Sequence, residues 1–408
     1  MASIRRTSSI IFMSLVIGGS RILAAAPAGS AAWRTEPQVS LITILPGEAL
    51  YSSFGHTAIR VLDPKAGSDV LYNYGLSENP FDLAFAARML VGRMEFTVGV
   101  LDTKSELQFY SQDENRTIIE QRLDLDEAQK ESMLSALETN ALPENRIYNY
   151  RYFSDNCATR VWKIFKTLDS GNSSTRPETP RPTLRESIGR TLAKRPWLDF
   201  AIDLMLGPEA DMRVKPDAPV FLPEELMNWT AGIAKSGTKS ETKLVDSTKT
   251  LYEARHERKK ATGITPLVAA IALLAIALAL GLFMRKDNPA AICFDAILFG
   301  AAAVVCLAIL LFWIAAGYGE VGPNLNLLWA IPLPLVALLR GRKPSGARAA
   351  MILFRITAVA AALVAILGGL GIQSISPAIR FIALAIALRC LVRGLDESTS
   401  ALPIARSR

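Results

Sequence analysis

The chain has 408 residues, of which 50% are hydrophobic and 20% are charged, and its mean hydropathy is +0.25. This composition is too apolar for a purely soluble protein and too charged for membrane helices alone. Residues 265–408 hold 12 of the 45 Lys and Arg but only 5 of the 38 Asp and Glu. The formal charge of +7 therefore lies entirely in the apolar C-terminal part, as expected for basic loops between membrane helices. We expect no nucleic-acid partner.

Residues 1–32 are typical of a secretory signal. Arg5 and Arg6 form a positive start, a short apolar run follows at residues 10–17, and small residues fill positions 23–32. The apolar run is too short to cross about 30 Å of hydrocarbon comfortably. An uncleaved signal anchor is the alternative, and both interpretations export the residues that follow.

The exported domain is predicted at residues 37–234, with strands and helices interleaved. Alternating β-branched and apolar residues predict strands at residues 39–44, 56–62, 70–74, 94–101 and 117–125, and an extended segment at 147–153. Helical spacing predicts a helical turn at residues 47–54 and a helix at residues 80–90. A second helix is predicted to begin at Asp126, with Gln129 completing a capping box, and a third to run from Asp155 or Asn156 to Leu168. These elements predict an α+β domain.

The C-terminal part is predicted to be an all-α membrane domain at residues 265–408, joined to the exported domain by a polar linker at residues 235–264. Five candidate spans lie at residues 266–284, 292–318, 325–339, 349–371 and 375–392. The third is short and contains two prolines, and the fifth contains arginines. The positive-inside rule places the C-terminus in the cytoplasm and the N-terminal domain outside.

Two scarce residue types point to one candidate site. Cys157 is the only Cys of the exported domain, because Cys293, Cys306 and Cys390 lie in predicted spans. His56 is the only His of its folded part, because the other, His256, lies in the predicted linker. The start of a helix is expected to lower the pKa of the Cys157 thiol, and an imidazole nearby would complete a nucleophilic pair. A buried structural Cys and a core His remain the alternative at this point.

The order of a His on a strand and a Cys at a helix start resembles the circularly permuted branch of the papain-like NlpC/P60 superfamily. Five segments resemble the Lnb family of bacterial lipoprotein N-acyltransferases more specifically. They are "ALYSSFGHTAIRV", "ENRTIIEQRLDL", "YFSDNCATRVW", "RPWLDFAIDLMLG" and "NLNLLWAIPLPL". The resemblance covers roughly residues 38–340. It implies a permuted papain-like domain on the periplasmic side of the bacterial inner membrane.

The resemblance also implies a reaction. Cys157 would take an acyl chain from a phospholipid as a thioester, and His56 would act as base and then as acid. The acceptor would be the N-terminal amine of a diacylglyceryl-cysteine lipoprotein. We expect Asn73 to orient the imidazole, although it could equally end a strand.

Further residues are candidates with weaker support. Tyr51, Ser53 and Asn156 are candidate oxyanion donors, together with the backbone N–H of Cys157. Arg160 could meet a phosphate or carboxylate, or simply face solvent. In the membrane domain, Arg380 could pair with a lipid phosphate or reach the interface by snorkelling, and Asn324 and Asn326 could line a lipid entry.

Three rival functions use the same residues differently. The first is a cell-wall peptidase, the second is a phospholipase or thioesterase that releases the acyl chain to water, and the third is a membrane assembly factor with an inactive papain-like fold. The sequence has no CxxC pair, His cluster or HExxH motif, so we expect no metal site, and we expect no cofactor.

Overall fold

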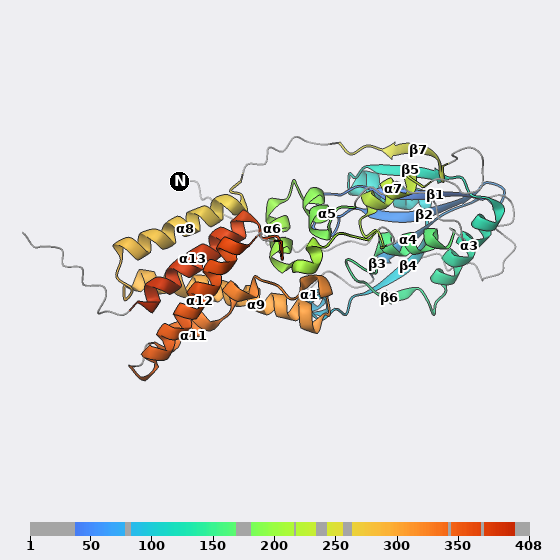
Figure 1. Ribbon diagram of the computed structural model, residues 1–408. Helices are drawn as coiled ribbons and strands as arrows, with labels where there is room; N and C mark the ends of the chain where they lie inside the picture. Colours follow the sequence, from blue (N-terminus) through green and yellow to red (C-terminus); the bar gives the residue numbers. More distant parts are fainter. Residues whose placement is uncertain are drawn as a thin grey trace, which may run out of the picture.

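The computed structural model describes residues 37–77, 83–168, 181–215, 218–233, 243–255, 263–341, 344–368 and 371–395. A strand-rich domain lies at one end of the molecule and long helices lie at the other, with a layer of short helices between them (Figure 1). The predicted signal at residues 1–32 and His256 lie outside the described residues. The architecture confirms a mixed α/β domain followed by a helical region with candidate membrane helices.

The exported domain is built on one antiparallel seven-stranded sheet with the order β6-β4-β3-β2-β1-β5-β7. The strands are β1 (Gln38–Ile44), β2 (His56–Asp63), β3 (Ser68–Leu76), β4 (Glu95–Asp102), β5 (Ile118–Leu123), β6 (Ile147–Asn149) and β7 (Val245–Tyr252). Ala58 of β2 pairs with Ile42 of β1 and with Asn73 of β3. This register places the start of β2 beside the end of β3, at one end of the central strands.

Helices cover the sheet, and α3 (Glu127–Ala141) and α4 (Cys157–Thr167) bury apolar faces in the core. The other helices of this domain are α1 (Leu83–Leu90), α2 (Thr103–Gln108), which continues into η2 (Phe109–Asp113), and α7 (Pro223–Ala231). In α4, Val161, Trp162 and Phe165 pack in one cluster with Leu41 and Ile59 of the sheet. A second cluster joins Tyr110 of η2 to Ile42, Ala58 and Leu71. The sheet is therefore packed on both faces.

Two predictions for this domain are wrong. Residues 47–54 form turns and bends instead of a helical turn, and they are held by hydrogen bonds such as Gly47 N–H to the Ser52 carbonyl. The predicted linker at residues 235–264 contains β7, which pairs with β5 over Val245–Tyr252. This edge strand is polar because its side chains are largely exposed, which explains why its sequence looks like a linker.

The membrane region contains three helices that are long and apolar enough to cross a bilayer, at Pro266–Phe283, Pro289–Ala315 and Ala347–Ile366. They correspond to the first, second and fourth predicted spans. The third breaks at Ile331 and Pro332 into α10 (Leu327–Ala330) and α11 (Leu333–Arg340). The fifth is α13 (Pro377–Gly394), whose 18 residues include Arg380, Arg389 and Arg393.

An ion cluster is buried among these helices near the ends opposite the exported domain. Asp295 of α9 (Pro289–Leu310) accepts hydrogen bonds from Arg389 at 2.6 and 3.0 Å and from Arg393 at 2.6 Å. Asp295 and Arg389 are both 0% exposed. Removing one member of a buried pair leaves an unpaired charge, whose cost is high in such surroundings.

We therefore expect Asp295→Ala to destabilise the membrane domain by about 3–5 kcal/mol, because two buried guanidinium groups lose their carboxylate. Ile297→Ala, which truncates an exposed side chain on the same helix, is the matched control. Thermal unfolding of the detergent-solubilised protein measures the effect. Equal midpoints for the two variants would show that the cluster does not stabilise the fold.

Short helices connect the sheet domain to the outer ends of the membrane helices. They are α5 (Leu184–Thr191), α6 (Pro196–Met205) and η3 (Pro208–Asp211). Asn324 and Asn326 donate side-chain hydrogen bonds of 3.0 to 3.1 Å to the Leu204 and Met205 carbonyls at the end of α6. The two asparagines, predicted as a lipid entry, are thus used in docking the domains. Arg380 donates to the Ala365 carbonyl at 2.8 Å.

Candidate active site

Cys157 is the first residue of α4, and Asn156 caps this helix. The Asn156 side chain accepts from the Thr159 N–H at 2.9 Å, and the Thr159 hydroxyl accepts from the Asn156 N–H at 2.7 Å. This capping box fixes the backbone around Cys157. The Asn156 amide also donates to the Tyr152 carbonyl at 2.7 Å and to the Phe221 carbonyl at 2.9 Å. Both amide hydrogens are used, so the side chain serves as a cap instead of the predicted oxyanion donor.

His56 is positioned by the turn that precedes β2. Gly55 has φ +81°, and a Cβ atom there would lie 2.9 Å from the Ile44 carbonyl oxygen. Only glycine fits this left-handed, crowded position, and it directs His56 into the first position of the strand. The His56 Nε2 atom lies 2.5 Å from Asn73 Oδ1. The structure thus brings together the predicted pair of His56 and Asn73.

The partners of Asn73 define the tautomer of His56. Asn73 Nδ2 donates to Glu106 Oε2 and to the Tyr110 hydroxyl, both at 3.2 Å. The amide oxygen therefore faces His56, and since this oxygen only accepts, Nε2 carries the hydrogen. The neutral imidazole keeps an unprotonated Nδ1, which is the form that a general base requires.

The Cys157 thiol lies against backbone N–H groups and is 6% exposed. Burial raises the pKa of the Cys157 thiol to about 11, although the nearby backbone N–H groups of Thr57, Ala158 and Cys157 itself act in the opposite direction. Burial also lowers the pKa of His56 to about 4, while the bond to Asn73 acts in the opposite direction. The expected low thiol pKa is therefore wrong for this structure, because desolvation exceeds the effect of the helix start.

Cys157 lies near the start of β2, the strand that begins with His56. The N–H of Thr57, the residue that follows His56, is close enough to the sulfur to lower the thiol pKa. Cys157 also lies near Gly75 of β3, where a Cβ atom would lie 4.0 Å from Cys157 Cβ. A neutral thiol beside a neutral imidazole needs a proton transfer to react, and such contacts often tighten only when substrate binds.

The raised thiol pKa predicts the pH dependence of alkylation. Because the thiolate is the nucleophile and the pKa is about 11, the rate at Cys157 should rise about tenfold per pH unit between pH 7 and pH 10. Iodoacetamide labelling, followed by mass spectrometry of the Cys157 peptide, measures this rate. A rate that stays constant above about pH 5 would instead indicate a preformed thiolate–imidazolium pair.

The turns at residues 47–54 lie beside this site, but their two predicted donors are engaged elsewhere. Ser53 donates to the Leu50 carbonyl at 2.7 Å and accepts from Arg195 at 2.7 Å. Tyr51 donates to Glu114 at 2.5 Å and is 43% exposed. In this structure Ser53 holds the turns in place, while Tyr51 is an accessible hydroxyl at their surface.

Arg160 is committed to structural contacts. Its guanidinium donates to both carboxylate oxygens of Asp155, at 3.0 and 2.8 Å, and lies 3.5 Å from the centroid of the Tyr148 ring. Such a two-point contact and ring stacking fix the side chain. It is thus neither a free phosphate ligand nor a simply solvated group.

Three residues around His56 were not predicted. Glu106 and Tyr110 hold the Asn73 amide, and Arg116 lies 5.5 Å from the Tyr110 ring centroid. Arg116 is 3% exposed, pairs with Glu114 at 2.7 Å and lowers the pKa of both His56 and Cys157. Glu114 and Arg116 lie at the start of the segment "ENRTIIEQRLDL", one of the five that resemble the Lnb family, so the sequence could have drawn attention to them. Nothing in the sequence distinguishes Glu106 from an ordinary carboxylate on a helix surface.

Aromatic contacts lead from the thiol to the membrane region. The Tyr150 ring lies near Cys157 and is 5.6 Å from the Tyr152 ring, which is 6.4 Å from the Tyr318 ring. Tyr318 follows the second membrane helix, and the Arg151 guanidinium lies 5.7 Å from its ring centroid. The site therefore lies on the side of the domain that faces the membrane helices.

Fold and site together define a protein with helices that can span a membrane and a separate sheet domain that holds a buried thiol and an amide-bound imidazole. Residues 34–189 match the model of the Lnb N-terminal periplasmic domain, and residues 257–399 match that of the Lnb transmembrane domain. The chain therefore belongs to the Lnb family, whose domains indicate a membrane enzyme of lipoprotein processing. No curated protein and no solved structure matches the chain.

Proposed function

We propose that this protein is a lipoprotein N-acyltransferase that moves an acyl chain from a phospholipid to the N-terminal amine of a diacylglyceryl-cysteine lipoprotein. The observation that carries the proposal is the buried Cys157 thiol at the start of α4, near the backbone N–H of Thr57, the residue that follows His56. Membership in the Lnb family supports the lipid substrates. We further propose that the domain has the permuted papain-like fold and faces the periplasm from the bacterial inner membrane.

In the first half-reaction, the Cys157 sulfur attacks the ester carbonyl carbon of the phospholipid while its proton passes to Nδ1 of His56. The ester C–O bond then breaks, and His56 returns the proton to the leaving oxygen of the lysophospholipid. The product on the protein is a thioester. Asn73 holds the Nε2–H of His56 throughout and stabilises the imidazolium that forms transiently.

In the second half-reaction, the lipoprotein amine attacks the thioester carbonyl carbon. The amine nitrogen loses a proton to His56, the C–S bond breaks, and the proton returns to the sulfur. The backbone N–H groups of Thr57, Ala158 and Cys157 lie near the thiol and are our proposed donors to the oxyanion of both steps. They take the role expected of side chains from Ser53 and Asn156.

Exclusion of water favours transfer over hydrolysis. Cys157 is 6% exposed, and the neighbouring aromatic side chains of Tyr150 and Tyr152 are packed against it or close by. An amine outcompetes water in a dry site, where the thioester survives until the acceptor arrives. This feature favours the transferase over a phospholipase or thioesterase.

The test is reconstitution of the full chain with a phospholipid and a diacylated lipopeptide. Mass spectrometry should show the lipopeptide gaining one amide-linked acyl chain, with one lysophospholipid formed per transfer. Release of free fatty acid at the same rate with and without the lipopeptide would contradict the proposal and indicate a lipase. Cleavage of cell-wall stem peptides in its place would indicate a peptidase.

A further inference from the structure

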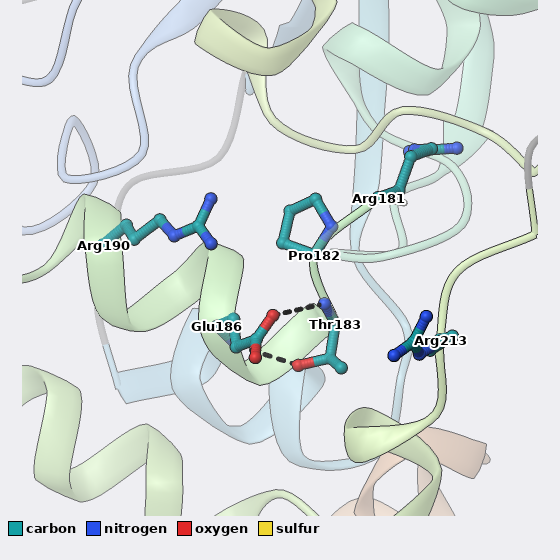
Figure 2. A pocket seen from close by; sticks show the side chains of 6 residues that line it. All are labelled: Arg181, Pro182, Thr183, Glu186, Arg190 and Arg213. Carbon is teal, nitrogen blue, oxygen red and sulfur yellow. Dashed lines mark hydrogen bonds between the residues drawn. The ribbon is translucent and has the colours of Figure 1, made fainter. Parts of the chain in front are cut away.

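A cavity lies in the layer of short helices, apart from the thiol site. It has a volume of about 220 Å³ and is lined by Arg181, Pro182, Thr183, Glu186, Arg190 and Arg213. Figure 2 shows Arg190 and Arg213 reaching toward it from opposite sides, with Pro182 and Thr183 between them. Three of its six lining residues are arginines, so the cavity is rich in positive charge.

The only carboxylate of the lining is already in use. Glu186 accepts from the Thr183 N–H at 3.0 Å, and the Thr183 hydroxyl accepts from the Glu186 N–H at 3.2 Å (Figure 2). This capping box opens α5 and fixes the floor of the cavity. Arg181 is fixed as well, because it donates to the Ala218 carbonyl at 2.7 Å and to the Lys215 and Pro219 carbonyls at 3.3 Å.

Arg190 and Arg213 differ from the other arginines of this layer. Neither forms an ion pair or side-chain hydrogen bond with any residue in the described parts of the chain. Arg185, on the same helix as Arg190, instead pairs with Asp203 and with Asp211, the latter at 2.8 Å. Two guanidinium groups that face one cavity without an ion-pair partner form a suitable site for the oxygen atoms of a phosphate group.

A residue close to the cavity contacts a loop between two helices of the membrane region. Asp211, two residues before Arg213, accepts from the Ser374 N–H in the loop between α12 (Ala347–Leu367) and α13 at 3.0 Å. Met212 is 66% exposed beside it, and Trp197 of α6 is 52% exposed. Exposed apolar side chains next to the outer helix ends are typical of contact with lipid.

We propose that this arginine cavity binds the phosphate group of a phosphate ester. The membrane position favours the headgroup of a phospholipid in the adjacent leaflet, and free phosphate is the other source of the same chemistry. Arg190 and Arg213 supply charge-assisted hydrogen bonds from two sides, and Arg181 adds positive charge from a fixed position. The inference does not depend on the acyl-transfer reaction, because the cavity and Cys157 share no residue.

Arginine modification tests the proposal on the full chain in maltoside micelles, which contain no phosphate. Arg190 and Arg213 are labelled with phenylglyoxal, and the labelling is followed by peptide mass spectrometry. Labelling is done under four conditions: no addition, dihexanoyl phosphatidylglycerol, dihexanoyl glycerol, and inorganic phosphate. Arg122 is the internal reference, because it is exposed on β5 and far along the sheet from this layer. We expect phosphatidylglycerol to slow the labelling of both cavity arginines about tenfold relative to Arg122.

A substitution in the cavity provides a second test of phosphate binding. Arg213→Gln should raise the phosphatidylglycerol concentration that protects Arg190 about tenfold. The matched control Arg285→Gln, with the same loss of charge at an exposed arginine between the first two membrane helices, should leave that concentration unchanged and keeps Arg122 as the reference. Protection by inorganic phosphate at the same concentration as the lipid would support the site and assign it to soluble phosphate. Equal labelling in all four conditions, or equal protection by dihexanoyl glycerol, would overturn the proposal.

Discussion

Cys157→Ala is expected to abolish acyl transfer while the protein still folds and inserts. The substitution removes the only nucleophile of the proposed mechanism, so activity should fall by roughly a thousandfold or more. Folding should persist because the capping box at α4 uses Asn156 and Thr159 and needs no thiol. Transfer of acyl chain to a lipopeptide, measured by mass spectrometry on equal amounts of inserted protein, gives the result.

Cys293→Ala is the matched control for this loss. It also removes a thiol, but Cys293 is exposed on a membrane helix and lies outside the proposed site. This variant should retain full activity. A Cys157→Ala protein that transfers acyl chains as fast as Cys293→Ala would exclude the thiol mechanism.

His56→Gln is expected to have the second-largest effect, a loss of roughly a thousandfold. The thiol pKa of about 11 leaves little thiolate at neutral pH, so attack by the sulfur depends on a base that removes its proton. An amide side chain can replace the hydrogen bond to Asn73 but cannot accept that proton. The loss should shrink as the pH rises toward 10, because hydroxide then forms the thiolate without His56.

His256→Gln is the control, since it changes the only other histidine of the chain. It should leave the rate unchanged at every pH. A His56→Gln loss that stays constant from pH 7 to pH 10 would indicate a structural role for His56 rather than a role as a base. The comparison therefore separates the two functions of this side chain.

Much of the sheet domain was predictable because its strands alternate in the sequence. The strand at residues 56–62, the capping box at Asp126 and the helix that Asn156 caps all occur as predicted. The register could not be predicted, since pairing between β1 and β5 joins residues far apart in the sequence. The edge strand β7 was missed because both of its faces are exposed, which removes the apolar alternation.

The candidate site was predictable in part for a different reason. Only one Cys and one His were available in the folded exported domain, so the pair of Cys157 and His56 followed from scarcity. The roles of neighbouring polar residues depend on partners that the sequence does not reveal. The Asn156 side-chain amide, for example, donates both of its hydrogens to the Tyr152 and Phe221 carbonyls. A lowered pKa was predicted for the Cys157 thiol, but the pKa is raised because burial depends on the tertiary structure.

The central claim is that Cys157 carries the acyl chain as a thioester. The most direct measurement mixes the full chain with phospholipid alone, quenches in acid and determines the mass of the Cys157 peptide. We predict a mass increase of one acyl chain, which hydroxylamine removes and Cys157→Ala lacks. Full N-acylation of a lipopeptide with no acyl group on Cys157 at any time during turnover would contradict the account.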